Sequence, residues 1–483
     1  MGGLPGDSER VQVYSGVADM RGVPVKAMLA LALMLAFASP LLAQSADRFP
    51  RPEFSNGHKE PSNQPKPWQL PRAVTMEWID VGVLILALSA AAYYSLKKVS
   101  RKAIFILSVG AVLYFGFYRE GCVCPIGAIQ NVAQGGGASA YGSGAPYVLP
   151  LTVVLFFLLP LIFALFFGRV FCASVCPLGA AQEMVIIKPI KVPKGVKHFL
   201  SLIPYVYLGT AVLFAYIGAD YIICKFDPFI GFFRMGANFG MYLFSGAVLV
   251  IGTVVARPYC RFMCPYSILL KWTSVLSKWH LKTTPTECIQ CRLCEESCPF
   301  DHLHKPSVEK EPEPRSTSVK RVALLLGLTP VIIAAGIGLG LLAAPVLARQ
   351  HFTVALAERV QLEKLKLVSD TTEESRAFYE TSMTPEQLFA NGQRVKNKVR
   401  NGSGILGAFI GLVVSCKLLA LSIRRKRTDY EPNRGDCYSC ARCSDACSVG
   451  KVPGVPVGTM RTSPVVLKFQ SQIAQGSGSE RTG

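Results

Sequence analysis

The sequence predicts a mostly helical protein that crosses a membrane several times, and three observations support this fold class. The 483 residues are 51% hydrophobic and only 17% charged, whereas soluble domains carry about 25% charged residues. Seven apolar stretches approach the ~20 residues needed to span a bilayer. The formal net charge of +20 comes mostly from Lys and Arg at the ends of these stretches. This distribution favours membrane topology and argues against nucleic-acid binding.

Residues 1–46 predict a signal peptide for export or, alternatively, an N-terminal membrane segment. Basic residues up to Lys26 precede the short apolar run Met28–Phe37, and small residues follow it, as in secretory signals. Met20 is an alternative start of translation. The polar, proline-rich residues 47–77 predict a loosely ordered exported linker.

The seven apolar stretches are the expected membrane helices. They are Trp78–Tyr94, Ala103–Tyr118, Tyr147–Phe167, Phe199–Ile217, Met241–Ala256, Val322–Leu347 and Ile405–Ile423. Clusters of Lys and Arg follow the first, third, fifth and seventh stretches. Because cytoplasmic loops carry this excess of basic residues, we expect these connections in the cytoplasm, and the protein in the bacterial cytoplasmic (inner) membrane. A cleaved signal predicts the same orientation.

Two copies of one cysteine pattern lie on the predicted cytoplasmic side. Their members are Cys288, Cys291, Cys294 and Cys298, followed by proline, and then Cys437, Cys440, Cys443 and Cys447. The spacing C-x2-C-x2-C-x3-C is the bacterial pattern for [4Fe–4S] clusters, in which the fourth Cys of each run binds the cluster of the other run. The rule joins Cys447 to the first run and Cys298 to the second. A zinc site or disulfides are alternatives that fit the spacing less well.

The two runs predict a small ferredoxin-like 2[4Fe–4S] module that is split in sequence. The expected segments are a membrane core (78–282), the first cluster motif (283–306), a membrane helix (320–347), an exported helical segment (348–402), a second helix (403–423), the second motif (424–460) and a disordered tail (461–483). The glycines from Gly336 to Gly340 lie within an apolar helix and predict helix packing, not nucleotide binding.

A second cysteine motif is duplicated inside the membrane core. The motif small-Arg-x-aromatic-C-x3-C-P contains Cys172 and Cys176, and returns 88 residues later with Cys260 and Cys264. On the exported side, Cys122-Val-Cys124-Pro follows the second stretch, and Cys224-Lys-Phe-Asp227-Pro follows the fourth. We therefore expect a duplicated two-helix unit. Each copy contributes cysteines to an inner station (Cys172, Cys176, Cys260 and Cys264) and to an outer station (Cys122, Cys124 and Cys224, with Asp227).

The Cys-Pro pairs have a physical use. Proline is favoured at the first position of a helix, and a Cys just before it lies at the positive end of the helix dipole, which stabilises its thiolate. The inner cysteines thus predict a further iron–sulfur site, and the outer cysteines with Asp227 predict another. Packing at helix ends is the alternative for both groups, and a Cys122–Cys224 disulfide is a second alternative on the oxidising side.

The stretch from about Ala103 to Lys305, with the later run from Cys437 to Cys447, resembles the NosR/NapH-type polyferredoxins; MauN-type ferredoxins are similar. The resemblance implies electron transfer between the quinol pool or a cytoplasmic donor and an exported redox enzyme. Two departures stand out. We find no S/T-G-A-T attachment motif of the flavin-binding domain that NosR-type proteins carry, and two helices separate the cluster runs here.

We therefore expect a membrane iron–sulfur electron-transfer protein. Two [4Fe–4S] clusters, and one or two further centres at the membrane faces, would link a cytoplasmic donor or quinol to an exported redox protein. One alternative is a quinol dehydrogenase that binds quinone without a transmembrane chain of centres, with His198 and His280 assisting proton release. Another is a redox sensor or an assembly factor for a metalloenzyme.

Overall fold

The computed structural model describes residues 74–121, 124–136, 149–235, 239–281, 291–306, 315–368, 370–381, 383–422, 427 and 430–447. The predictions for the signal segment, most of the proline-rich linker and the tail lie outside these residues. The same holds for Cys122 and Cys288.

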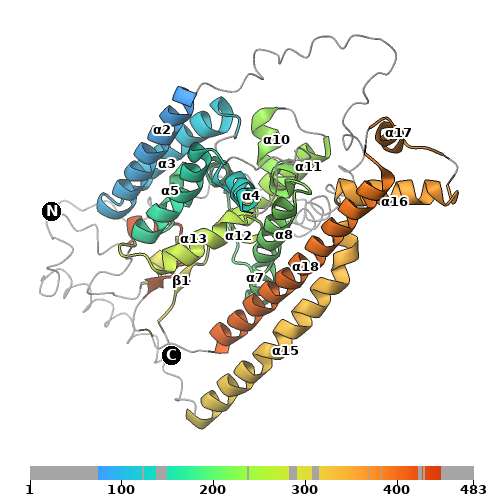
Figure 1. The fold of residues 1–483 in the computed structure, drawn as a ribbon. Helices are drawn as coiled ribbons and strands as arrows, with labels where there is room; N and C mark the ends of the chain where they lie inside the picture. The colour runs from blue at the N-terminus through green and yellow to red at the C-terminus, as the bar shows by residue number, and fades with distance from the viewer. Residues whose placement is uncertain are drawn as a thin grey trace, which may run out of the picture.

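The described chain is mostly helical, as predicted, and each of the seven apolar stretches falls on a helix (Figure 1). These helices are α2 (Val74–Ala92, continued by η4, Tyr93–Lys97), α3 (Arg101–Ala111, continued by η5, Val112–Tyr118), α5 (Leu151–Phe167), α8 (Ile203–Ile217), α11 (Phe239–Val254), α15 (Arg315–Ala348) and α18 (Pro385–Ser422). Five helical segments are long and apolar enough to cross a membrane, whereas α5 and α11 are shorter.

Short helices lie between the long ones and carry the duplicated motifs. They are α4 (Pro125–Gly135), η6 (Phe171–Val175), α6 (Pro177–Met184), α7 (Lys194–Leu200), α9 (Ile222–Phe226), α10 (Pro228–Arg234), α12 (Pro258–Phe262) and α13 (Tyr266–Val275). Proline is the first residue of α4, α6 and α10, and the preceding Cys124, Cys176 or Asp227 is the N-cap. These three pairs therefore start helices, as the sequence predicts. Helix α13 instead starts one residue later, with Pro265 as its N-cap, and Pro299 after Cys298 lies in a turn.

Helices α15 and α18 form a long hairpin held by small residues. A side chain at Gly336 or Gly340 would overlap the backbone of Gly407 or Ser403 on α18, so only small residues permit this close approach. This confirms the packing role expected for Gly336 and Gly340, whereas a Cβ on Gly338 would meet no atom within 4 Å. Helices α16 (Phe352–Lys364) and α17 (Glu373–Tyr379) lie at the end of the hairpin farthest from strand β1 (Figure 1). We call that end of the molecule the outer end, and the end with β1 the inner end.

The two ferredoxin-type runs meet at the inner end, although the whole hairpin separates them in sequence. Strand β1 (Leu303–His304) pairs antiparallel with β2 (Glu431–Pro432). Helix α14 (Leu293–Glu296) of the first run contacts α19 (Arg442–Asp445) of the second. The two runs thus fold together as one small unit, which we call the ferredoxin module.

Candidate metal centres

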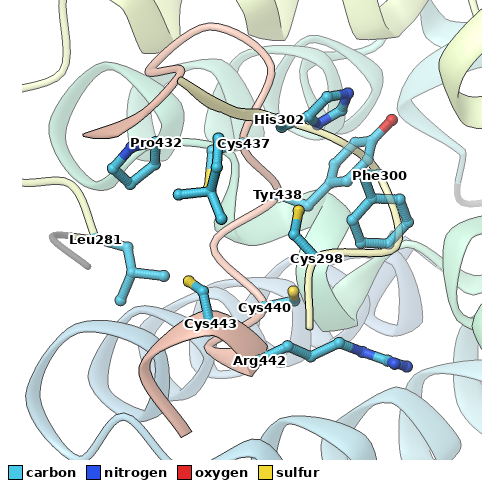
Figure 2. Close-up of a pocket in the computed structure, with 11 residues that line it drawn as sticks. Leu281, Cys298, Phe300, His302, Pro432, Cys437, Tyr438, Cys440, Arg442 and Cys443 are labelled. Carbon is cyan, nitrogen blue, oxygen red and sulfur yellow. The ribbon is translucent and has the colours of Figure 1, made fainter. Parts of the chain in front are cut away.

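Four cysteines from the two runs line one cavity in the ferredoxin module. Cys298 comes from the first run, and Cys437, Cys440 and Cys443 come from the second. Figure 2 shows their side chains around a common space. The cavity, with its opening to solvent, measures about 350 Å³. This is the grouping that a shared fourth ligand requires.

The backbone of the second run is shaped for an anionic group. Ser439 (φ 54°) and Ala441 (φ 60°) have left-handed conformations on either side of Cys440. In the first run, Arg292 (φ 63°) follows Cys291 as Ala441 follows Cys440, and it has the same conformation. Such alternation turns successive N–H groups toward one concave side, where they bind anions. The Ser439 N–H accordingly donates to Cys437 Sγ at 3.4 Å. The donor set and the backbone both fit a [4Fe–4S] cluster.

The remaining ligands of the first run are described only in part. Cys291 is exposed, while Cys294 and Cys447 are partly buried. Cys294 and Cys298 pack against the same small apolar cluster as Cys443. Within the described ranges, no three His, Cys, Asp or Glu side chains lie close enough to hold a single metal ion. The thiolates of a [4Fe–4S] cube attach to four different irons, so their arrangement differs from the ligand shell of one ion.

The inner cysteines lie together in the membrane core. Cys172, Cys176, Cys260 and Cys264 are each 6–8% exposed and belong to one apolar cluster. Two of these thiols receive hydrogen bonds from buried side chains. Gln182 Nε2 donates to Cys260 Sγ at 3.3 Å, and Arg169 Nη2 lies 3.8 Å from Cys172 Sγ. The predicted inner station is therefore a buried group of four thiols with nearby donors.

The arginines of the duplicated motif hold the second run against this group. Tyr438, 2% exposed, lines the thiol cavity. The guanidinium carbons of Arg169 and Arg257 lie 4.7 Å and 5.3 Å from the centroid of its ring. Phe300 packs edge-on against the same ring at 4.9 Å. Tyr438 thus belongs both to the cavity lining and to the apolar cluster of the inner cysteines, with a cation over its ring from each repeat.

Opposite charges on the two repeats anchor the second run. The fully buried Glu183 carboxylate pairs with Arg257 at 2.8 Å and with Arg442 of the second run at 2.5 Å. Lys271 pairs with Asp436 of the second run at 2.8 Å. Glu183 and Lys271 follow the last Cys of their motifs by the same interval, 176 to 183 and 264 to 271. The repeated Arg was visible in the sequence, but its partner Tyr438 was not, because nothing local to Cys437 marks it.

Burial and neighbouring charges also shift the pKa values of two groups in the ferredoxin module. Burial alone would raise the pKa of the Asp436 carboxyl, but the ion pair with Lys271 holds its pKa well below the usual range. Burial lowers the pKa of His302 well below its ordinary value, which keeps the ring neutral. The ring of His302 lies 5.5 Å from that of Tyr438.

The outer station contacts the inner motif. Asp227 is 1% exposed. One of its carboxylate oxygens accepts a hydrogen bond from the Phe229 N–H at 2.9 Å, and the other accepts from the Tyr259 hydroxyl at 3.1 Å. Tyr259 precedes Cys260 of the inner motif. Cys224 lies beside α4, where its N–H donates to Gln130 Oε1 at 3.3 Å.

These features define a class, a helical membrane protein that buries groups of thiols suited to iron–sulfur clusters. A family described as "4Fe-4S binding domain" matches residues 149–193 and 237–284. Each match contains one of the duplicated C-x3-C-P motifs. No solved structure matches the chain.

Three relatives carry informative names. The chain is 32% identical to Protein NirI of Paracoccus denitrificans over 28% of its own length and 22% of NirI. It is 27% identical to the putative electron transport protein YccM of Escherichia coli, over 29% of this chain and 43% of YccM. It is 26% identical to the regulatory protein NosR of Pseudomonas aeruginosa, over 40% of this chain and 28% of NosR. The matched part thus covers less than half of each of these three relatives. The chain is a membrane iron–sulfur electron-transport protein that is similar to proteins of the NosR/NapH type.

Proposed function

We propose that this protein passes electrons between a cytoplasmic donor, or the quinol pool, and an exported redox partner. The observation that carries the proposal is the packing of Tyr438 between Arg169 and Arg257. This contact brings the thiol cavity of the ferredoxin module directly against the four thiols of the membrane core. A protein whose clusters served only the cytoplasm would not need such an approach.

The proposed ligands follow from the two groups of thiols. Cys298, Cys437, Cys440 and Cys443 would hold one [4Fe–4S] cluster, because they line one cavity. Cys288, Cys291, Cys294 and Cys447 would hold its partner. Cys172, Cys176, Cys260 and Cys264 would hold a centre in the membrane core. When bound, such clusters carry one electron at a time.

The surrounding residues prepare these sites for electron transfer. The buried guanidinium groups of Arg169 and Arg257 would offset the negative charge of thiolate-bound clusters and raise their reduction potential. Gln182 orients Cys260 through its hydrogen bond. The apolar core excludes water around the inner thiols, and the ion pairs of Glu183 and Lys271 fix the module on the core.

The test compares a Cys172→Ser/Cys260→Ser double variant with the parent protein. We expect about twelve irons per chain in the parent and about eight in the variant, with the signals of the two ferredoxin-type clusters retained. In vesicles, the variant should lose electron transfer from a reductant on one side to an acceptor on the other. Iron content and EPR after anaerobic purification measure the first result. Unchanged iron and unchanged transfer would contradict the proposal.

A second candidate, quinol oxidation, is favoured by a cavity between α2 and η5. Met76, Ile79, Asp80, Tyr114 and Tyr118 line a space of about 610 Å³ that includes its open side. Asp80 accepts a hydrogen bond from the Tyr114 hydroxyl at 2.9 Å and could take up a proton from a bound quinol. The exposed His198 lies on α7, a helix that contributes no residue to this cavity.

Quinol oxidation has a separate test. In an Asp80→Asn variant, reduction of the clusters by a soluble quinol should slow at least tenfold, while their reduction by dithionite stays the same. A Glu77→Gln variant, one turn away on the same helix, serves as the matched control. Equal quinol rates in all three proteins would exclude this cavity as the quinol site.

A further inference from the structure

Two short helices of the core, α4 and α6, begin at cysteines that are their N-caps. From Cys124, α4 runs to the outer end, where Gln134 near its last turn accepts a hydrogen bond from the Tyr221 hydroxyl. From Cys176, α6 runs to the inner end, where Glu183 pairs with Arg442 of the ferredoxin module. Helix α4 also contacts α13, which follows Cys264 (Figure 1).

Cys124 shares its surroundings with the inner thiols. It packs against the apolar cluster that contains Cys172, Cys176, Cys260 and Cys264. The hydrogen bond between Asp227 and Tyr259 joins the outer station to the inner motif on the other repeat. A full hydrocarbon thickness of about 30 Å therefore does not separate the two stations.

Several buried polar atoms around these thiols have no hydrogen-bond partner among the described residues. Gln130 and Ser174 are completely buried, and Gln130 Nε2 and Ser174 Oγ lack partners. Tyr207 packs against the same apolar cluster, and its buried hydroxyl also lacks a partner. Unsatisfied buried donors are rare because each costs about 1–3 kcal/mol. They indicate a group in this region that accepts hydrogen bonds, as the sulfurs of a cluster do.

We propose that Cys124 is a ligand of the same membrane centre as Cys176 and Cys264. The two predicted stations then form one iron–sulfur site near the middle of the core. This inference rests on the proposed function, because it assigns a further ligand to the membrane centre. The three thiols share one feature, since each directly precedes a proline and is followed by a short helix. The positive ends of α4 and α6 would both stabilise the negative charge of the site.

The experiment compares single variants Cys124→Ser, Cys264→Ser and Cys224→Ser after anaerobic purification. Serine also caps helices well, so α4 should still form. Cys224 is the matched control, because it is the other described cysteine of the outer station. We expect Cys124→Ser and Cys264→Ser to lose the same EPR signal and about four irons, while Cys224→Ser keeps both. In every variant, the ferredoxin-type signals should remain and report that the protein has folded.

Retention of the membrane signal in Cys124→Ser, with its loss in Cys264→Ser, would overturn the inference alone. Retention in both variants would also remove the membrane centre from the proposed function. A second measurement needs no variant. In the parent protein, Cys124 and Cys264 should resist alkylation together and react together once the clusters are destroyed. Alkylation of Cys124 while the clusters are intact would overturn the inference.

Discussion

Tyr438 lines the thiol cavity and belongs to the apolar cluster of the inner cysteines, and its ring and its hydroxyl can be separated by mutation. Tyr438→Leu removes the ring between Arg169 and Arg257, and should weaken docking of the ferredoxin module by about 2 kcal/mol or more. Tyr438→Phe keeps the ring and should change little. The temperature at which the visible cluster absorbance bleaches measures the difference. Equal bleaching temperatures for the two variants would mean that the stacked ring contributes nothing to docking.

Glu183 is the residue on which three guanidinium groups converge. Glu183→Gln would leave the fully buried Arg257 without a carboxylate, and should destabilise the protein by about 3–5 kcal/mol. Glu295 provides the contrast, because its partners Lys191 and Lys305 are 53% and 62% exposed. Glu295→Gln should cost about 0–1 kcal/mol. Thermal unfolding in detergent compares the two, and similar losses would show that burial of Arg257 is not the cause.

His302 gives the ferredoxin module a pH dependence with a defined sign. The folded state holds the ring neutral by burial, whereas the unfolded chain protonates it near pH 6.5. The unfolded state therefore binds more protons below about pH 6.5, and stability should fall by up to about 1.4 kcal/mol per pH unit there. Asp436 adds a similar loss only below about pH 4. In a His302→Phe variant, bleaching temperatures should hardly change from about pH 7.5 to about pH 5.5. A fall equal to that of the parent protein would show that another group causes the pH dependence.

At the scale of elements, the hairpin of α15 and α18 can be tested through glycines that differ only in their surroundings. A side chain on Gly407 would overlap the Gly336 backbone, whereas a Cβ on Gly338 meets no atom within 4 Å. Gly407→Leu should therefore destabilise the hairpin by about 1–3 kcal/mol or more, and Gly338→Leu should be tolerated. Because the hairpin carries the two runs to each other, Gly407→Leu should also lower iron content. Normal iron content in Gly407→Leu would show that the module assembles independently of this contact.

Elements were largely predictable because their signals are local. Apolar length predicted the seven long helices, and proline after Cys or Asp predicted where α4, α6 and α10 start. The depth of Cys124 was not predictable in the same way. Position along the chain predicts Cys124 on the exported face, and in the structure Cys124 also packs against the apolar cluster that contains the inner cysteines. Hydropathy reports which segments lie in a membrane and does not report where short helices begin within it.

At the scale of the whole molecule, the pairing of the two cysteine runs followed from their spacing, while their docking on the core did not. The spacing rule required Cys298 and the second run to approach each other, and they line one cavity. The arginine–tyrosine stack and the ion pairs of Glu183 and Lys271 depend on residues far apart in sequence. With a single sequence, no local pattern marks such partners.

The split module also sets an order of events during biosynthesis. The second run leaves the ribosome only after both helices of the hairpin. Cys298 is therefore made well before Cys437, Cys440 and Cys443, the other thiols that line the cavity. A nascent chain at the translocon therefore offers no complete set of four thiols in this cavity. Insertion of the cluster proposed for this cavity would therefore be a late step that follows synthesis of the hairpin.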